Sequence, residues 1–316
     1  MQKSKRIESV DFIKCVCIIL MVIFHLAYFT DQYPIAKQFV YTFHMPIFLF
    51  ISGFFLNTSK SAKDFLHSSM RILIPYIIME VLYVIAASFL PTRDAVDNLS
   101  PALVLDKLFI HPLGPYWYLH TILIASTICF GTSKLLTKIG DRLQKNFSKY
   151  EPFVASLLLV AFSIGTGLMD MANIFYYALG FIVASANIDF ERFVRPSLVI
   201  SLIGVLLIAL AQEGALPSKQ RMSGQFIVYG MMSFMMGLYN VLPQCIKKWS
   251  LRIGRSTLSI LLFSPIFTMA SKLMIPYLEF DSSRILYMVL ATIISISGSM
   301  LIAKVLELLT RGKYHS

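Results

Sequence analysis

Long runs of apolar residues recur along the whole chain, and short polar segments rich in Lys and Arg separate them. A helix needs about 20 mainly apolar residues to cross the hydrocarbon core of a bilayer. The runs therefore predict an all-α, polytopic integral membrane protein with about ten transmembrane helices. The predicted spans cover residues 12–29, 38–56, 71–90, 115–131, 152–169, 173–187, 194–211, 222–242, 256–276 and 285–309.

The composition supports a membrane protein. Of the 316 residues, 57% are hydrophobic and only 14% are charged, and the mean hydropathy is +0.70. A soluble domain could not bury so much apolar surface. We therefore expect one transmembrane domain over residues 1–316 and no soluble domain.

The basic residues predict the orientation of these spans. With the N-terminus inside, nineteen of the 28 Lys and Arg residues fall in cytoplasmic segments, six in outer segments and three within spans. Cytoplasmic loops of membrane proteins carry such an excess. Both termini are therefore expected in the cytoplasm, and the net charge of +11 indicates topology and contact with lipid headgroups rather than nucleic-acid binding.

The first predicted span carries ionisable residues that are costly in hydrocarbon and usually mark function. Lys14 and His25 are eleven residues apart, which places them within roughly 20° of one helix face and about 16 Å apart along the axis. Asp11 lies within roughly 40° of the same face. Its position three residues before Lys14 predicts that the two side chains pair.

Other polar residues have both a structural and a functional interpretation. Glu80 lies near the middle of the third predicted span and needs a partner there. His44 and His120 are either hydrogen-bonded packing residues or functional groups. Residues 116–118, Tyr-Trp-Tyr, open the fourth span and are interpreted as an interfacial aromatic belt. No set of His, Cys and carboxylate residues has a recognisable metal-ligand spacing, so no metal site is predicted.

Several stretches in order along the chain carry a family resemblance. They are Lys14-(ten residues)-His25, Phe43-His-Met-Pro-Ile-Phe-Leu-Phe-Ile-Ser-Gly-Phe54, Arg71-Ile-Leu-Ile-Pro-Tyr76, Gly114-Pro-Tyr-Trp-Tyr-Leu119 and Gly254-Arg-Ser-Thr-Leu-Ser-Ile260. With these stretches the sequence resembles the acyltransferase-3 family of membrane-bound O-acyltransferases, particularly the branch with fucose O-acetylase-like members that modify surface polysaccharides. The resemblance implies ten helices in a bacterial plasma membrane.

The resemblance also implies an activity, namely transfer of an acetyl group from cytoplasmic acetyl-CoA, the acyl donor, to a hydroxyl of a surface or lipid-linked glycan. The essential basic residue and histidine of the family fall on Lys14 and His25. We expect His25 to act as general base or to carry the acyl group, with His44 and Glu80 as further catalytic candidates. The candidates for donor binding are Lys14, Arg71, Asp11 and Ser52, and Ser52 and Gly53 would permit close approach of backbone or donor.

Two departures from the family pattern keep other interpretations open. Ser68 stands where members often have an arginine, and Leu261 and Ser264 stand where many have a Tyr and a His. If a second histidine is required, it must come from elsewhere, such as His44. A transporter or flippase for a small or lipid-linked substrate is the competing class, and an inactive or sensory relative is the third.

Overall fold

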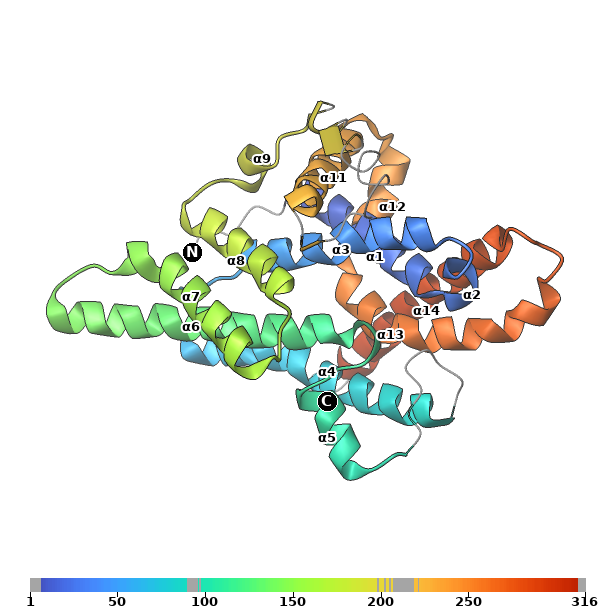
Figure 1. Cartoon of the computed structure of the whole chain (residues 1–316), viewed down its shortest axis with the longest axis horizontal. Coiled ribbons are helices and arrows are strands. Elements are labelled where there is room, and N and C mark those ends of the chain that lie inside the picture. The colour runs from blue at the N-terminus through green and yellow to red at the C-terminus, as the bar shows by residue number, and fades with distance from the viewer. Residues whose placement is uncertain are drawn as a thin grey trace. The chain divides into compact units, whose positions relative to one another are not determined.

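The structure is a computed structural model, and it describes residues 7–89, 96, 98–197, 199–201, 203–204, 206, 219–220 and 222–311. In these residues all regular elements are helices, which confirms the all-α class (Figure 1). The α-helices are α1 (Glu8–His25), α2 (Ala27–Thr30), α3 (Pro34–Phe54), α4 (Ala62–Phe89), α5 (Pro101–Phe109), α6 (Trp117–Leu143), α7 (Glu151–Thr166), α8 (Met171–Ser185), α9 (Phe190–Phe193), α11 (Met222–Val241), α12 (Gln244–Arg255), α13 (Thr257–Ala270) and α14 (Ile285–Arg311). Three short 3-10 helices are η1 (Gly114–Tyr116), η2 (Ser148–Tyr150) and η3 (Ser271–Tyr277).

Four helical segments among the described residues are long and apolar enough to cross a membrane. They are Ala62–Phe89, Gly114–Leu143, Thr257–Tyr277 and Ile285–Leu309. Helix α1 carries Glu8, Asp11 and Lys14 within its 18 residues, more charge than an ordinary span tolerates. The number of ten spans remains a prediction, and most of the predicted seventh span, 194–211, lies outside the described residues.

Three predicted spans have clearly different bounds in the structure. The third begins earlier than predicted, because α4 starts at Ala62 rather than at residue 71. The first, 12–29, is not one helix, because α1 ends at His25, Leu26 is extended with ψ of 91°, and the short α2 follows. The fourth continues well past residue 131, since α6 runs on to Leu143 and ends at Gln144 in the left-handed conformation. The basic segment after residue 131 is thus largely a continuation of α6.

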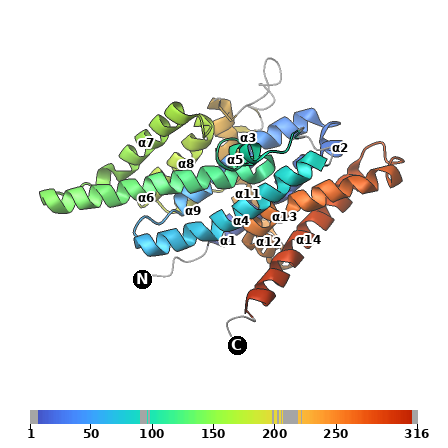
Figure 2. The ribbon, with the colours of Figure 1, turned by 90° about the horizontal axis from the view of Figure 1, so that it is seen from below.

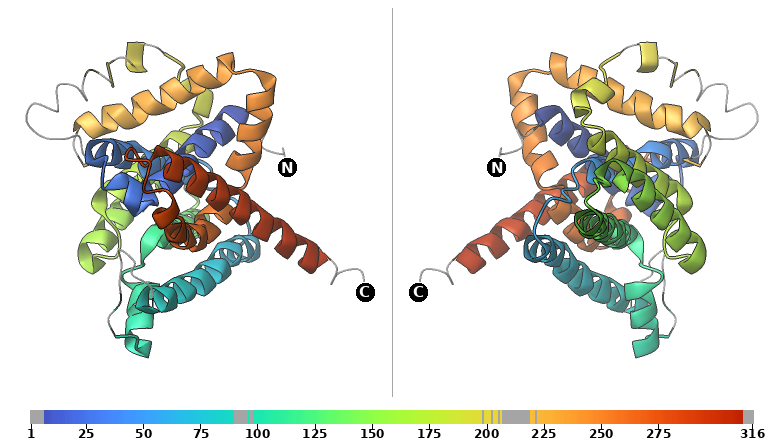
Figure 3. Two further views of the ribbon diagram at one scale, coloured as in Figure 1. Left: turned by 90° about the vertical axis from the view of Figure 1, so that its right-hand side faces the viewer. Right: turned by 90° about the vertical axis from the view of Figure 1, so that its left-hand side faces the viewer.

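The chain divides into two compact units, and the first comprises residues 1–44 and 196–316. In this unit α1 packs against α11, α12, α13 and α14. Helices α13 and α14 run side by side (Figure 2), and Gly298 leaves the space that the ring of Phe267 fills. The start of α1 lies beside α12 (Figure 3).

The second unit comprises residues 45–195. Helix α6 packs against α4 and α7, α7 packs against α8, and α4 packs against α5. Helix α5 begins where its sequence predicts, because the Ser100 hydroxyl accepts a hydrogen bond from the Leu103 amide at 3.2 Å and Pro101 occupies the first turn. Helix α3 contributes its first residues, through His44, to the first unit and the rest to the second.

Candidate functional site

A buried carboxylate organises the beginning of α1. The Asp11 side chain is only 3% exposed, and its Oδ1 lies 2.7 Å from Lys14 Nζ. Its Oδ2 lies 3.5 Å from Nε of Arg255, the last residue of α12. The predicted pairing of Asp11 with Lys14 is therefore confirmed. Arg255 is a partner that the sequence analysis did not identify, although it lies in one of the stretches that carry the family resemblance.

The close approach of α12 to α1 depends on a glycine. A Cβ on Gly254 would collide with the backbone carbonyl of Asp11, so only a glycine permits this contact. A second link lies one turn earlier on α1, where the Tyr239 hydroxyl donates to the Glu8 carboxylate at 2.6 Å. The Lys247 ammonium lies 4.8 Å from the centre of the Tyr239 ring. Helices α11 and α12 thus fix the charged end of α1 from two sides.

His25 ends α1 and lies close to a tyrosine and a second histidine. The rings of His25 and Tyr41 are 6.2 Å apart between centres, and those of Tyr41 and His44 are 5.3 Å apart. The Tyr41 hydroxyl donates to the carbonyl of Phe24 at 3.0 Å, which joins α3 to the last turn of α1. Tyr41 was missed from the sequence, although its position three residues before His44 places both on one helix face.

The two histidines are held in the same way. Nδ1 of His25 lies 2.6 Å from the Met21 carbonyl, and Nδ1 of His44 lies 2.7 Å from the Val40 carbonyl. Because a carbonyl only accepts, Nδ1 carries the hydrogen in the neutral ring and Nε2 is left as the proton-accepting nitrogen. His44 is 2% exposed, and its Nε2 has no hydrogen-bond partner within the described parts of the chain. In both neutral rings Nε2 is therefore the nitrogen that carries the lone pair.

Ser52 lies in the second unit and forms a hydrogen bond with Tyr118, which the sequence analysis placed at the membrane interface. Its hydroxyl is 2.7 Å from the Tyr118 hydroxyl. Tyr116 is fully buried and Tyr118 is 8% exposed. The interpretation of these two tyrosines as an interfacial belt is therefore wrong, because their hydroxyl-bearing rings pack inside the second unit. Belt residues and buried tyrosines look alike in a sequence, since both occur at the ends of apolar runs.

The expected close approach at Gly53 is confirmed, and the neighbour is backbone. A Cβ on Gly53 would collide with the carbonyl of Tyr177 on α8, and one on Gly180 would collide with the carbonyl of Phe50 on α3. The two glycines therefore let α3 and α8 cross in backbone contact.

Arg71 is exposed on α4, in the second unit. One turn earlier, Ser68 accepts a hydrogen bond from Lys60 Nζ at 3.0 Å and donates to the Asp64 carbonyl at 2.7 Å. Lys60 thereby brings a positive charge to the position at which the family resemblance leads one to expect an arginine.

Glu80 is fully buried on α4, and its carboxylate binds the backbone of the segment that follows α5. Its Oε1 accepts a hydrogen bond from the Leu113 amide at 2.7 Å. Tyr76, one turn earlier, donates from its hydroxyl to the Leu108 carbonyl at 2.6 Å, and His120 Nε2 on α6 lies 3.0 Å from the Phe109 carbonyl. The last carbonyls of a helix lack intrahelical donors, so Tyr76 and His120 satisfy the end of α5. The contact supports the packing interpretation of His120.

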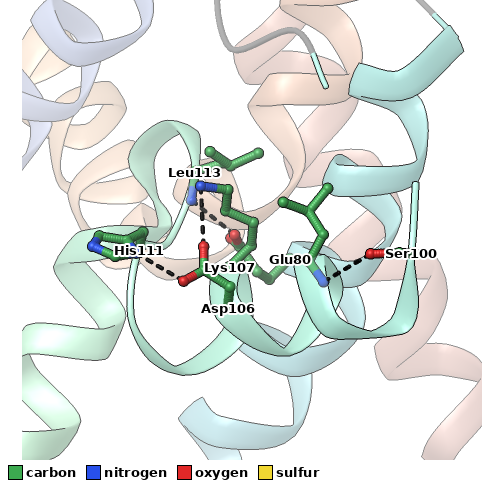
Figure 4. A network of polar contacts seen from close by, with 7 residues as sticks. Glu80, Ser100, Asp106, Lys107, His111 and Leu113 are labelled. Atoms are coloured by element: carbon green, nitrogen blue, oxygen red, sulfur yellow. Dashed lines mark hydrogen bonds and ion pairs between the residues drawn. The ribbon is translucent and has the colours of Figure 1, made fainter. Parts of the chain in front are cut away.

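A polar cluster around Asp106 lies beside the α5 segment that Glu80, Tyr76 and His120 hold in place (Figure 4). Asp106 on α5 lies 2.9 Å from Nδ1 of His111 and 3.2 Å from Nζ of Lys107. The hydrogen bond with His111 is the main reason that the pKa of the Asp106 carboxyl lies below its ordinary value, and the hydrogen bond with Lys107 lowers this pKa further. The segment from Ser100 to Tyr116 therefore consists of α5, a turn that Glu80 and Asp106 hold, and η1.

The structure brings some of the predicted site residues together. Asp11 and Lys14 form one group in the first unit, and His25 and His44 form a second group around Tyr41. The candidates in the second unit are Ser52, Arg71 and Glu80, and each has its own surroundings there.

A comparison with known protein families covers nearly the whole chain. The family model described as an acyltransferase domain matches residues 7–304. The chain therefore belongs to this acyltransferase family.

A curated relative is the nodulation protein NolL of Mesorhizobium japonicum, with 28% identity over 199 residues. The match covers 57% of this chain and 48% of the relative, so the chain spans about half the length of that protein. No solved structure matches the chain.

Proposed function

We propose that the protein transfers an acetyl group from cytoplasmic acetyl-CoA to a hydroxyl of a surface or lipid-linked glycan at a bacterial plasma membrane. The observation that carries this proposal is α1 itself. It bears the family's basic residue at Lys14, held by Asp11, and ends at a histidine whose Nδ1 is engaged by Met21, so that Nε2 is the basic nitrogen. Family membership supplies the acyl transfer; the donor, the acceptor and the residue roles are proposed.

The acyl donor carries phosphates, and the cations at the expected cytoplasmic helix ends suit them. Lys14 on α1 and Arg71 on α4 are the proposed phosphate ligands. Lys60, docked on Ser68, adds a charge one turn from Arg71. Ser52, hydrogen-bonded to Tyr118, lies near the close α3–α8 crossing and is proposed to border the path of the thioester arm.

The chemical step needs a base with a pKa near neutrality, which an ordinary imidazole provides. In the proposed step Nε2 of His25 takes the proton of the glycan hydroxyl as its oxygen attacks the thioester carbonyl. The carbon–sulfur bond then breaks, and the departing CoA thiolate recovers the proton from His25. The products are the acetyl ester and free CoA.

Tyr41 and His44 complete the proposed chemistry. Tyr41 positions His25 by packing against its ring and by its hydrogen bond to Phe24. The buried Nε2 of His44 is proposed to accept a hydrogen bond from a second hydroxyl of the glycan substrate. Glu80 enters the proposal as a positioning residue, since its carboxylate accepts the Leu113 amide.

The test is the base-labile acetyl signal of surface glycans, measured by proton NMR. A strain lacking the protein is complemented with wild type, with His25→Ala, or with His67→Ala as a control at an exposed position of α4. We expect wild type and the His67 variant to restore the signal and the His25 variant to leave it absent at equal protein level. An acetyl pattern unchanged by deletion would overturn the proposal.

A further inference from the structure

We propose that Arg255 is a donor-binding residue that acts beside Lys14, and that its ligand is a phosphate of the acyl donor. This inference rests on the proposed function and deepens it. Arg255 lies in the stretch 254–260 that carries the family resemblance, but the resemblance assigns it no role. Its contact with the Asp11 carboxylate, the packing of α12 against α1 and the exposure of its guanidinium support the assignment.

The first step concerns charge. One carboxylate, Asp11, faces two cations, because Lys14 Nζ lies 2.7 Å from Oδ1 and Arg255 Nε lies 3.5 Å from Oδ2. The nearby Glu8 carboxylate accepts the Tyr239 hydroxyl. Lys14, Arg255 and the Lys247 ammonium over the Tyr239 ring outnumber the Asp11 and Glu8 carboxylates, so this end of α1 carries one net positive charge. Such a group attracts an anion.

The second step concerns which atoms remain available. Arg255 meets Asp11 through Nε, and its side chain is 48% exposed. Within the described residues Arg255 forms no other ion pair, and its two terminal nitrogens donate no hydrogen bond. These nitrogens form the fork that binds phosphate oxygens in pairs, which a lysine ammonium cannot do.

The third step concerns rigidity. Gly254 is in backbone contact with Asp11, so the residue that follows it has a fixed position relative to α1. An ion pair with a half-exposed arginine contributes little to the stability of a fold, because water screens it. The contact is therefore better explained as orientation of the guanidinium than as a support of the fold.

The experiment compares Arg255→Gln with Arg252→Gln, which removes the same charge from an exposed position one turn away on α12. Two donors are used: acetyl-CoA, and S-acetylpantetheine, which has the same thioester and no phosphate. We expect Arg255→Gln to lower kcat/KM for acetyl-CoA about 10-fold through KM, as loss of a charge-assisted hydrogen bond would, and to leave S-acetylpantetheine unchanged. Arg252→Gln should change neither donor more than about 2-fold.

The outcomes separate the inference from the proposed function. If Arg255→Gln lowers kcat/KM for both donors equally, Arg255 supports α1 without binding phosphate, and the inference is overturned while the function stands. Equal effects of the two arginine variants on acetyl-CoA would also overturn it. If wild type neither transfers acetyl from acetyl-CoA nor binds CoA in a titration, the proposed function itself fails.

Discussion

Glu80 shows how a buried carboxylate in an apolar helix can serve the backbone of its own protein. Its Oε1 accepts the Leu113 amide, and the neighbouring Tyr76 and His120 bind the carbonyls of Leu108 and Phe109. Three side chains thereby fix the segment between α5 and α6. A buried amide that loses its acceptor costs about 1–3 kcal/mol, so this anchor matters for stability whatever its role in catalysis.

The proposed positioning role of Glu80 predicts different results for two substitutions. Glu80→Gln keeps a side-chain oxygen for the Leu113 amide and should retain most of the transfer activity and thermal stability. Glu80→Leu removes the acceptor and should lower the free energy of unfolding by about 1–3 kcal/mol. Transfer assays and thermal unfolding in detergent measure both. If Glu80→Gln unfolds like wild type and has lost its activity, the carboxylate acts in the chemistry.

Two single residues illustrate what the sequence does and does not disclose about the site. Pairing of Asp11 with Lys14 was predictable because both lie three residues apart on one helix. Arg255 was not, since 241 positions separate it from Lys14 and only the packing of Gly254 on α1 brings it there. Tyr118 was misplaced because a buried tyrosine with a serine partner has the same local sequence as a belt tyrosine.

The crossing of α3 and α8 depends on two glycines that leave no room for a side chain. Gly53 and Gly180 each lie against a carbonyl of the opposite helix. Small residues at such crossings permit the backbone contact that stabilises membrane helix pairs.

Substitution of one glycine should therefore separate the two helices. Gly180→Ala should lower the melting temperature and the amount of folded protein, since the added methyl group collides with the Phe50 carbonyl. Gly165→Ala on α7 is the control, because a methyl group there meets nothing within 4 Å and alanine favours helix by about 1 kcal/mol. Equal melting temperatures of the two variants would contradict the crossing.

Helix positions were largely predictable because apolar runs of membrane length are unambiguous. Helices α7, α8, α11 and α14 coincide with predicted spans to within three residues at each end, whereas α4 begins nine residues before its span. The ends were less predictable. The break at Leu26 carries no proline or glycine, and α6 continues to Leu143 through polar residues that hydropathy alone excludes.

The topology that the asymmetry of the basic residues predicts is testable by labelling. In a background with Cys15, Cys17, Cys129 and Cys245 replaced by Ser, a single cysteine is introduced at Asn146 or at Glu279. With both termini in the cytoplasm, an impermeant maleimide added to intact cells should label Glu279→Cys and spare Asn146→Cys until the cells are opened. The opposite pattern would reverse the predicted orientation.

The most direct measurement follows labelled acetyl from donor to glycan in isolated membranes. Membranes with wild type, His25→Ala or His67→Ala receive acetyl-CoA with a radioactive acetyl group, and the base-labile label in the glycan fraction is counted. We expect comparable label with wild type and the His67 variant, and at least about a hundredfold less with the His25 variant, as loss of a general base would give. Normal incorporation by the His25 variant would contradict the proposed catalytic role of α1.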